Sequence, residues 1–200
     1  MNRLIIVGAS GHGKVVADIA RLNGYTDILF LDNNSEIKNC AGHHVLGPDS
    51  MLSELNGDVF IAVGNATVRK KLMEQYSDRL FPILIHPQAV VADSVKLGSG
   101  TVVMAGVVIN PETTVGKGCI INTASSVDHD CDISDYVHVS VGAHVAGTVN
   151  IGEGTWVGAG AIISNNINVC ENCMIGAGAV VITSITVEGT YIGVSAKRNN

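Results

Sequence analysis

The sequence is poor in aromatic residues and in long apolar runs. Only 3 Phe, 4 Tyr and 1 Trp occur among 200 residues, so small aliphatic side chains must build most of the interior. No apolar stretch approaches the length of about 20 residues that a membrane-spanning helix needs. Near the amino terminus only Leu4–Val7 is continuously apolar, which is too short for the apolar part of a signal peptide. We therefore expect a soluble, cytoplasmic protein without a membrane span.

Basic clusters and paired cysteines are also scarce. The net charge is −6 and no basic run is longer than Arg69-Lys70-Lys71, which argues against a nucleic-acid partner. The 5 cysteines, an odd number, fit a reducing compartment. Cys170 and Cys173 form a CxxC motif, but no second pair completes a zinc site. We therefore expect neither metal binding nor redox use of this pair.

The second half of the sequence has a strict six-residue period. From residue 91 to residue 192, seventeen consecutive hexapeptides begin with Val, Ile or Leu, the last of them at Val187. A small or β-branched residue usually follows four places later, and this inward fifth position is taken by Cys119, Cys131 and Cys173. Such a period is typical of a parallel β-helix with three hexapeptides in each coil. Residues eighteen apart should then stack at the strand spacing of about 4.8 Å.

The first part of the chain alternates short strands with helices. We expect strands at Leu4–Val7, Ile28–Leu31, Val59–Val63 and Phe81–Ile85, and helices at Lys14–Leu22, Ser50–Leu55 and Thr67–Tyr76. His43 and His44 fall in a stretch expected to be irregular and solvated. The alternation predicts a Rossmann-like parallel α/β sheet in residues 1–85, followed by an all-β domain in residues 86–200.

A glycine-rich loop, Gly8-Ala-Ser-Gly-His-Gly13, joins the first expected strand to the first expected helix. This arrangement presents backbone N–H groups and a helix N-terminus to phosphate. Asp32 ends the second strand, where an acidic side chain can reach a ribose or a base edge. We expect His12 to lie in the loop and to contact a ligand. The glycine spacing is not G-x-G-x-x-G, so a tight turn without a ligand is the alternative interpretation.

With six residues in each hexapeptide and eighteen in each coil, His129 falls at a corner of the β-helix and Gly147 lies one coil further on. A glycine there leaves room beside the imidazole and an N–H group that can meet a developing oxyanion. The adjacent carboxylate of Asp130 would raise the basicity of the imidazole. Asn122, seven residues earlier, is expected in the same neighbourhood. A solvated corner without a catalytic role is the alternative interpretation.

A trimeric zinc enzyme of the gamma-class carbonic anhydrase type does not fit the histidine spacing. The zinc ligands of that class include two histidines five residues apart and a third about two coils earlier. Here His129, His138 and His144 are separated by nine, six and fifteen residues, and Val102 stands two coils before His138. We therefore expect no metal.

The chain resembles the nucleotide-sugar N-acetyltransferases of bacterial glycan biosynthesis and their sialic-acid O-acetyltransferase relatives. The resemblance covers nearly the whole chain and is carried by segments 8–13, 30–32, 61–65, 84–87, 122–123, 129–130, 138–142 and 193–197. It implies a left-handed β-helix, a homotrimer, and direct transfer of acetyl from acetyl-CoA to the 4-amino group of a nucleotide-linked deoxysugar. A sugar or sialic-acid O-acetyltransferase and a non-catalytic nucleotide-sugar-binding trimeric scaffold are the alternatives, and the nucleotide and the sugar stay open.

The resemblance also implies roles for individual residues. His129 would be the general base, Asp130 would strengthen it and Asn122 would orient the imidazole. The phosphates of the substrate would be held by Ser10, Gly11 and His12, and its nucleoside by Asp32, Asn33 and Gly64. The acetyl-CoA cleft between two subunits would be lined by His138, Gly147, Ala159 and Ala177. Relatives often carry Asp where this chain has Asn33, so the identity of the base is not predicted.

Overall fold

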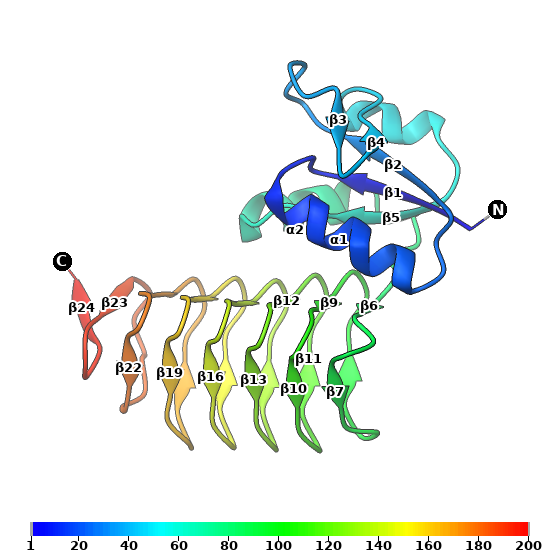
Figure 1. Cartoon of the computed structure of the whole chain (residues 1–200). Helices are drawn as coiled ribbons and strands as arrows, with labels where there is room; N and C mark the ends of the chain where they lie inside the picture. Colours follow the sequence, from blue (N-terminus) through cyan, green and yellow to red (C-terminus); the bar gives the residue numbers. More distant parts are fainter. Residues whose placement is uncertain (1, 200) are drawn as a thin grey trace. The chain divides into compact units, whose positions relative to one another are not determined.

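The computed structural model describes residues 2–199, which divide into two compact units after His86. The first unit contains a three-stranded parallel sheet in the order β2-β1-β5 (Figure 1). Its strands are β1 (Arg3–Val7), β2 (Asp27–Leu31) and β5 (Asp58–Ile61), and its α-helices are α1 (Gly11–Leu22) and α2 (Ala66–Gln75). Along β1 the residues from Leu4 to Val7 are all buried, as expected for a parallel strand that is covered on both faces.

Helix α1 begins three residues earlier than the sequence predicts, at Gly11 instead of Lys14. Glycine is a poor helix former, so the pattern alone places residues 11–13 in the loop. The structure shows why glycine is needed at residue 13. A Cβ on Gly13 would lie 2.2 Å from the carbonyl oxygen of Gly8 and 3.1 Å from the ring of Phe30. Glycine therefore lets the first turn of α1 pack directly on the strand ends.

Three other elements of the first unit differ from their predictions. The segment predicted as the helix Ser50–Leu55 is a 3-10 helix, η1 (Asp49–Glu54). A short antiparallel hairpin, β3 (Asn39–Cys40) and β4 (His43–His44), replaces the expected irregular stretch. Its turn contains Ala41 and Gly42, both at positive φ. Only Leu84 and Ile85 of the expected strand Phe81–Ile85 form a strand, β6.

The second unit is a parallel β-helix of short strands on three faces (Figure 1). The first face contains β7 (Val90–Val91), β10 (Val108–Ile109), β13 (Ser126–Val127), β16 (His144–Val145), β19 (Ile162–Ile163) and β22 (Val180–Val181). The second contains β8 (Lys96–Leu97), β11 (Thr114–Val115), β14 (Asp132–Ile133), β17 (Asn150–Ile151) and β20 (Asn168–Val169). The third contains β9 (Val102–Val103), β12 (Ile120–Ile121), β15 (His138–Val139), β18 (Trp156–Val157), β21 (Met174–Ile175), β23 (Thr190–Ile192) and β24 (Lys197–Asn199).

The predicted period is confirmed along most of this unit. Strands pair in parallel with partners eighteen residues apart, as in Val127↔Val145 and Val139↔Val157. Every hexapeptide opener from Val103 to Val181 is buried. The three fifth-position cysteines Cys119, Cys131 and Cys173 are buried as well. The core is thus a set of columns of small aliphatic side chains, which explains how a chain with few aromatics folds.

The last predicted hexapeptide is wrong. Val187 is 51% exposed, and Ile185 occupies the inward place and bridges to Val169. Ile175 pairs with Tyr191, sixteen residues later, so the final coil is two residues shorter than the others. The chain then reverses, because β24 runs antiparallel to β23. Among residues 2–199, no helix is long and apolar enough to cross a membrane.

Candidate active site

His129 lies at the corner between β13 on the first face and β14 on the second, where its side chain is exposed. Its Nδ1 lies 2.7 Å from Oδ2 of Asp130. The backbone N–H of His129 donates to Oδ1 of Asp128 at 2.9 Å. The same oxygen accepts from Nδ2 of Asn110, one coil earlier, at 2.6 Å. The imidazole is therefore held with Nδ1 towards a carboxylate, which leaves Nε2 available to accept a proton.

Two carboxylates raise the pKa of His129 above its ordinary value. The hydrogen bond with Asp130 is the largest cause, and the charge of Asp128 comes next. Both effects favour the imidazolium form. The arrangement makes His129 a stronger proton acceptor than an unpaired surface histidine.

Gly147 lies directly beside this imidazole, as its spacing of eighteen residues from His129 predicts. A Cβ on Gly147 would come within 2.7 Å of Nε2 and 2.8 Å of Cε1 of His129. Any side chain there would therefore displace the ring. Glycine at position 147 is required by the histidine and not by its own backbone conformation.

Asn122 does not contact His129. Its Nδ2 lies 3.0 Å from Nε2 of His138, and its Oδ1 accepts from the backbone N–H of Thr123. The reason is the three-faced coil: Asn122 lies at the corner between β12 and β13, and His129 lies at the next corner, so the strand β13 separates them. The expectation that Asn122 orients the imidazole of His129 is corrected for a single chain.

His138 belongs to a cluster with Asn122 and Trp156 that the sequence pattern does not predict. The ring of Trp156, one coil further on, lies 4.7 Å from the His138 ring between centroids. Nε1 of Trp156 donates to Oγ of Ser140 at 2.6 Å. Ala159 and Ala177, one coil apart, are exposed at the same corner as Asn122. Three of the four residues expected to line the acetyl-CoA cleft therefore share one corner, while Gly147 lies at the corner of His129.

In the first unit, the glycine-rich loop and the loop after β5 leave open space. A Cβ on Gly11 or on Gly64 would meet nothing within 4 Å, and neither residue has a positive φ. Neither the packing nor the backbone conformation of this unit requires glycine at these two positions. Ser10 immediately precedes α1, at whose N-terminus backbone N–H groups are available to an anion.

His12 lies in the first turn of α1 and not in the loop, which corrects its predicted place. Burial, and to a lesser extent the nearby Arg69 guanidinium, lower its pKa to about 4. Its Nε2 is buried and has no hydrogen-bond partner in the described chain. His12 is therefore neutral at neutral pH and could contact phosphate only as a neutral hydrogen-bonding group.

Asp32 and Asn33 follow β2 and border a hollow of about 140 Å³ that also touches Gly8 and Val63. Oδ2 of Asp32 accepts from the backbone N–H of Ala9 at 2.7 Å, and its Oδ1 accepts from that of Asn34. Asn33 exchanges two hydrogen bonds with Asp49. Asp32 thus holds the glycine-rich loop in place, a role that the sequence pattern does not reveal.

Arg69 was also missed as a site residue. It is 1% exposed, and its Nη1 donates to the carbonyl oxygens of Val63 and Gly64. A buried guanidinium therefore shapes the loop beside the hollow. The sequence offers no signal for this role, since Arg69 opens the only notable basic run and reads as a surface residue.

Metal binding finds no support in residues 2–199, where no three His, Cys, Asp or Glu side chains gather in a way that could hold an ion. The arrangement suits proton transfer at His129 and ligand binding at the two loops of the first unit.

Comparisons with known proteins place the chain among sugar-modifying enzymes. Residues 3–76 match the model of the PglD N-terminal domain. The acetyltransferase domain of PglB from Neisseria gonorrhoeae FA1090 is 38% identical, with a TM-score of 0.96 and 100% of both chains covered. The chain belongs to the nucleotide-sugar N-acetyltransferase family.

Two further members of this family are relevant. PerB from Caulobacter crescentus, solved in complex with CoA and GDP-perosamine, is 35% identical with a TM-score of 0.94, and the match covers 100% of this chain and 98% of PerB. The UDP-N-acetylbacillosamine N-acetyltransferase of Bacillus subtilis (strain 168) is 38% identical over 113 residues. That match spans about half of the length of this curated relative, 52% of each chain.

Proposed function

We propose that the protein is an acetyl-CoA-dependent N-acetyltransferase that acts on the 4-amino group of a nucleotide-linked deoxyaminosugar in bacterial glycan biosynthesis. The observation that carries this proposal is the imidazole of His129, held by Asp130 on one side and given space by Gly147 on the other. Relatives solved with acetyl-CoA, or with CoA and GDP-perosamine, support the choice of both substrates.

His129 is the general base in this proposal. The sugar amine attacks the thioester carbonyl, Nε2 of His129 takes a proton from the nitrogen, and the C–S bond breaks to release CoA as the thiolate. The imidazolium then returns the proton to the departing sulfur. Base catalysis of this kind contributes roughly 10²–10⁴-fold. Asp130 stabilises the imidazolium without accepting the proton itself.

The acetyl-CoA cleft lies between two subunits of a homotrimer in this proposal. His129 and Gly147 occupy one corner of the coil, whereas Asn122 and His138 occupy the corner at the other end of the first face. This separation supports a site that two copies of the chain share. A closed ring of identical subunits places the first corner of one copy against the second corner of its neighbour.

The first unit binds the nucleotide sugar. Ser10, Gly11 and the neutral His12 lie at the N-terminus of α1, where backbone N–H groups suit the phosphates. The nucleoside is assigned to the loops that carry Asp32, Asn33 and Gly64. The open space over Gly11 and Gly64 supports this assignment, since a bound ligand explains glycines that the chain itself does not require.

An acetyl-CoA turnover assay tests the proposal. The purified protein is offered UDP-, GDP- and dTDP-linked 4-aminosugars, the matching 4-hydroxy sugars and free sialic acid. Acetylation of a 4-aminosugar, with the amide located by mass spectrometry, is the expected result. Transfer to a hydroxyl acceptor alone would establish an O-acetyltransferase. Nucleotide-sugar binding without turnover of any acceptor would establish a scaffold.

A further inference from the structure

Cys170 and Cys173 lie together at the corner between β20 on the second face and β21 on the third. Their sulfur atoms are 3.4 Å apart. Cys173 is buried in an inward column, whereas Cys170 is partly exposed. A shift of about 1.4 Å would bring the sulfurs to the length of a disulfide bond. This corner differs from the one that carries His129, which joins the first and second faces.

The backbone of this corner is fixed by a threonine one coil earlier. The hydroxyl of Thr155 donates to the carbonyl oxygen of Cys170 at 3.0 Å and accepts from the N–H of Cys173 at 3.1 Å. The same pattern surrounds two other inward cysteines: Thr101 bridges Gly116 and Cys119, and Thr113 bridges Asp128 and Cys131. At these two corners the residue three places before the cysteine is Gly116 or Asp128, which carries no thiol. Cys119 and Cys131 are therefore matched controls for Cys173, because each has the same threonine contacts but no second thiol beside it.

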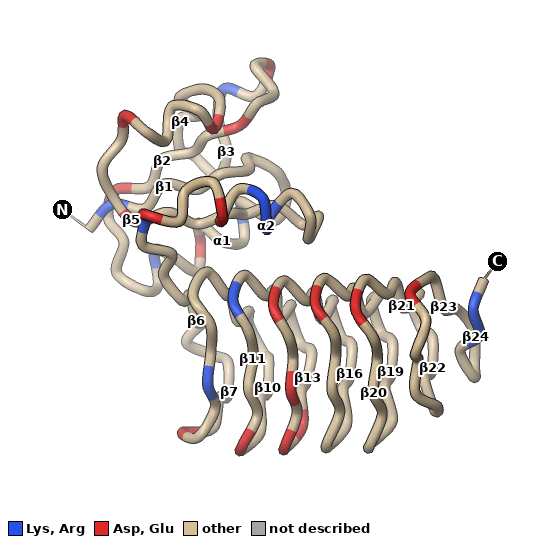
Figure 2. The backbone as a smooth tube through the Cα atoms, turned by 180° about the vertical axis from the view of Figure 1, so that it is seen from behind, with Lys and Arg blue, Asp and Glu red and all other residues tan. Residues whose placement is uncertain are grey.

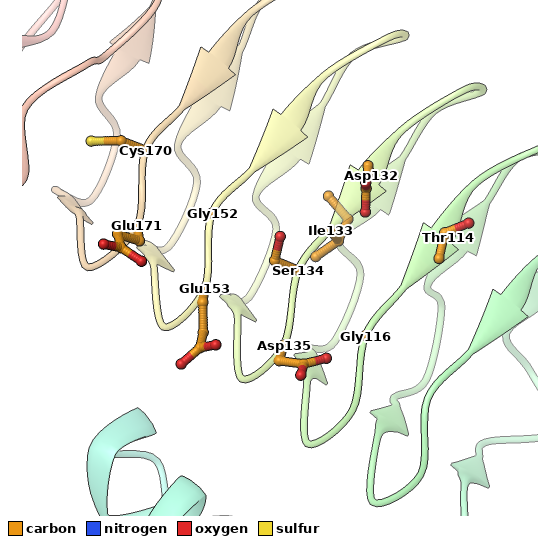
Figure 3. A pocket seen from close by; sticks show the side chains of 10 residues that line it. All are labelled: Thr114, Gly116, Asp132, Ile133, Ser134, Asp135, Gly152, Glu153, Cys170 and Glu171. Carbon is orange, nitrogen blue, oxygen red and sulfur yellow. The ribbon is translucent and has the colours of Figure 1, made fainter.

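A groove of about 720 Å³ leads to Cys170, and carboxylates line it. Asp135, Glu153 and Glu171 follow one another at one-coil spacing along the same edge, with Cys170 beside Glu171 (Figure 3). Acidic segments recur in a row along this edge of the β-helix (Figure 2). Lys117 offsets part of the charge, because its Nζ lies 3.6 Å from Asp135. The remaining negative charge favours cationic molecules in the groove.

We propose that Cys170 and Cys173 form a redox-active dithiol site, which small cationic disulfides oxidise to an intramolecular disulfide. Cys170 is the attacking residue because it lines the groove and is partly exposed, whereas Cys173 is buried. Burial raises the pKa of Cys173 to about 12, so this thiol stays protonated and reacts second. The burial of the two side chains thus assigns the order in which the cysteines react.

Cystamine, a disulfide with two ammonium groups, illustrates the step. The sulfur of Cys170 attacks cystamine, the S–S bond of the reagent breaks, and one cysteamine leaves with the proton that Cys170 gave up. Cys173 then attacks the mixed disulfide, and its proton leaves with the second cysteamine. Two protein thiols are oxidised and one cystamine is reduced to two cysteamines.

Mass spectrometry of the full chain after cystamine treatment tests the site. The wild type should become lighter by two hydrogen atoms, with one disulfide in the peptide that contains both residues. Cys170→Ser should stay fully reduced, and Cys173→Ser should stop at a mixed disulfide on Cys170. Cys119 and Cys131 should remain thiols in every sample. A mixed disulfide that persists on wild-type Cys170, or oxidation that survives in Cys170→Ser, would overturn the proposal.

The charge of the reagent tests the role of the groove. Cystamine should oxidise the pair about tenfold faster at low salt than neutral bis(2-hydroxyethyl) disulfide, and anionic glutathione disulfide should be slowest. Added salt should reduce the differences between the oxidation rates of the three reagents, and so should the double change Glu153→Gln with Glu171→Gln. Equal rates for the three reagents, after correction for their intrinsic reactivity with a free thiol, would rule out the proposed preference for cations.

Discussion

At the scale of single residues, the contact between His129 and Asp130 makes a prediction about pH. Because the base must be unprotonated, kcat/KM should rise with pH through the raised pKa of His129. Asp130→Asn removes the main cause of that shift, so the rising limb should move to lower pH. The maximal rate should also fall, since a weaker base accepts the proton less readily. Asparagine tolerates the positive φ of residue 130, so the fold should be kept.

A pH–rate profile of Asp130→Asn measures this shift. Asp93→Asn, which changes an exposed acid in the first coil, serves as the matched control and should leave the profile unchanged. A limb at the same pH in Asp130→Asn and in the wild type would show that Asp130 does not tune His129.

At the scale of one corner, Gly147→Ala should impair catalysis with little loss of stability. The new methyl group would occupy the place of Nε2, and the exposed imidazole can only swing away from Asp130. The melting temperature should therefore change little while kcat falls. In the background of His129→Ala the same change should have no further effect, because the residue it displaces is absent.

This cycle of four proteins separates displacement of the base from general disruption. Equal losses from Gly147→Ala with and without His129 would show that the glycine serves the fold and not the imidazole.

At the scale of the whole molecule, the two units should divide the work of binding. Gly11→Val should raise the KM for the nucleotide sugar and leave the Kd for acetyl-CoA unchanged, because the added side chain enters open space beside the N-terminus of α1. Arg21→Val, in the last turn of the same helix, is the matched control and should change neither constant. Titration calorimetry measures both ligands. A normal KM for the nucleotide sugar in Gly11→Val would show that the loop is a tight turn that does not bind the substrate.

The shared cleft can be tested with mixed trimers. His129→Ala and Asn122→Ala should each be inactive alone. When the two variants are refolded together in equal amounts, three of every four trimers contain both kinds of chain, and each of these has one interface with both wild-type residues. About a quarter of the wild-type number of active sites should therefore be restored. Separate refolding followed by mixing without exchange is the control. A mixture as inactive as its parents would place the site within one chain.

The residue spacing predicts much of this architecture and part of the site. It predicts the coil, its burial pattern and the contact between His129 and Gly147, because residues eighteen apart must stack. The prediction fails at Val187, where the final coil is shorter than eighteen residues. It also fails at Gly11, because glycines in the first turn of α1 look like part of the preceding loop in the sequence. Asn122 shows a further limit: a separation of seven residues in sequence gives no hint that one face of the coil lies between this residue and His129.

The role of His129 as the general base is tested by the turnover of His129→Ala, measured beside acetyl-CoA binding by the same sample. We expect kcat to fall by at least about a hundredfold while the Kd for acetyl-CoA stays nearly the same, because the base is removed and the acetyl-CoA contacts are kept. A variant that binds acetyl-CoA normally and retains more than about a third of wild-type turnover would show that His129 is not the base.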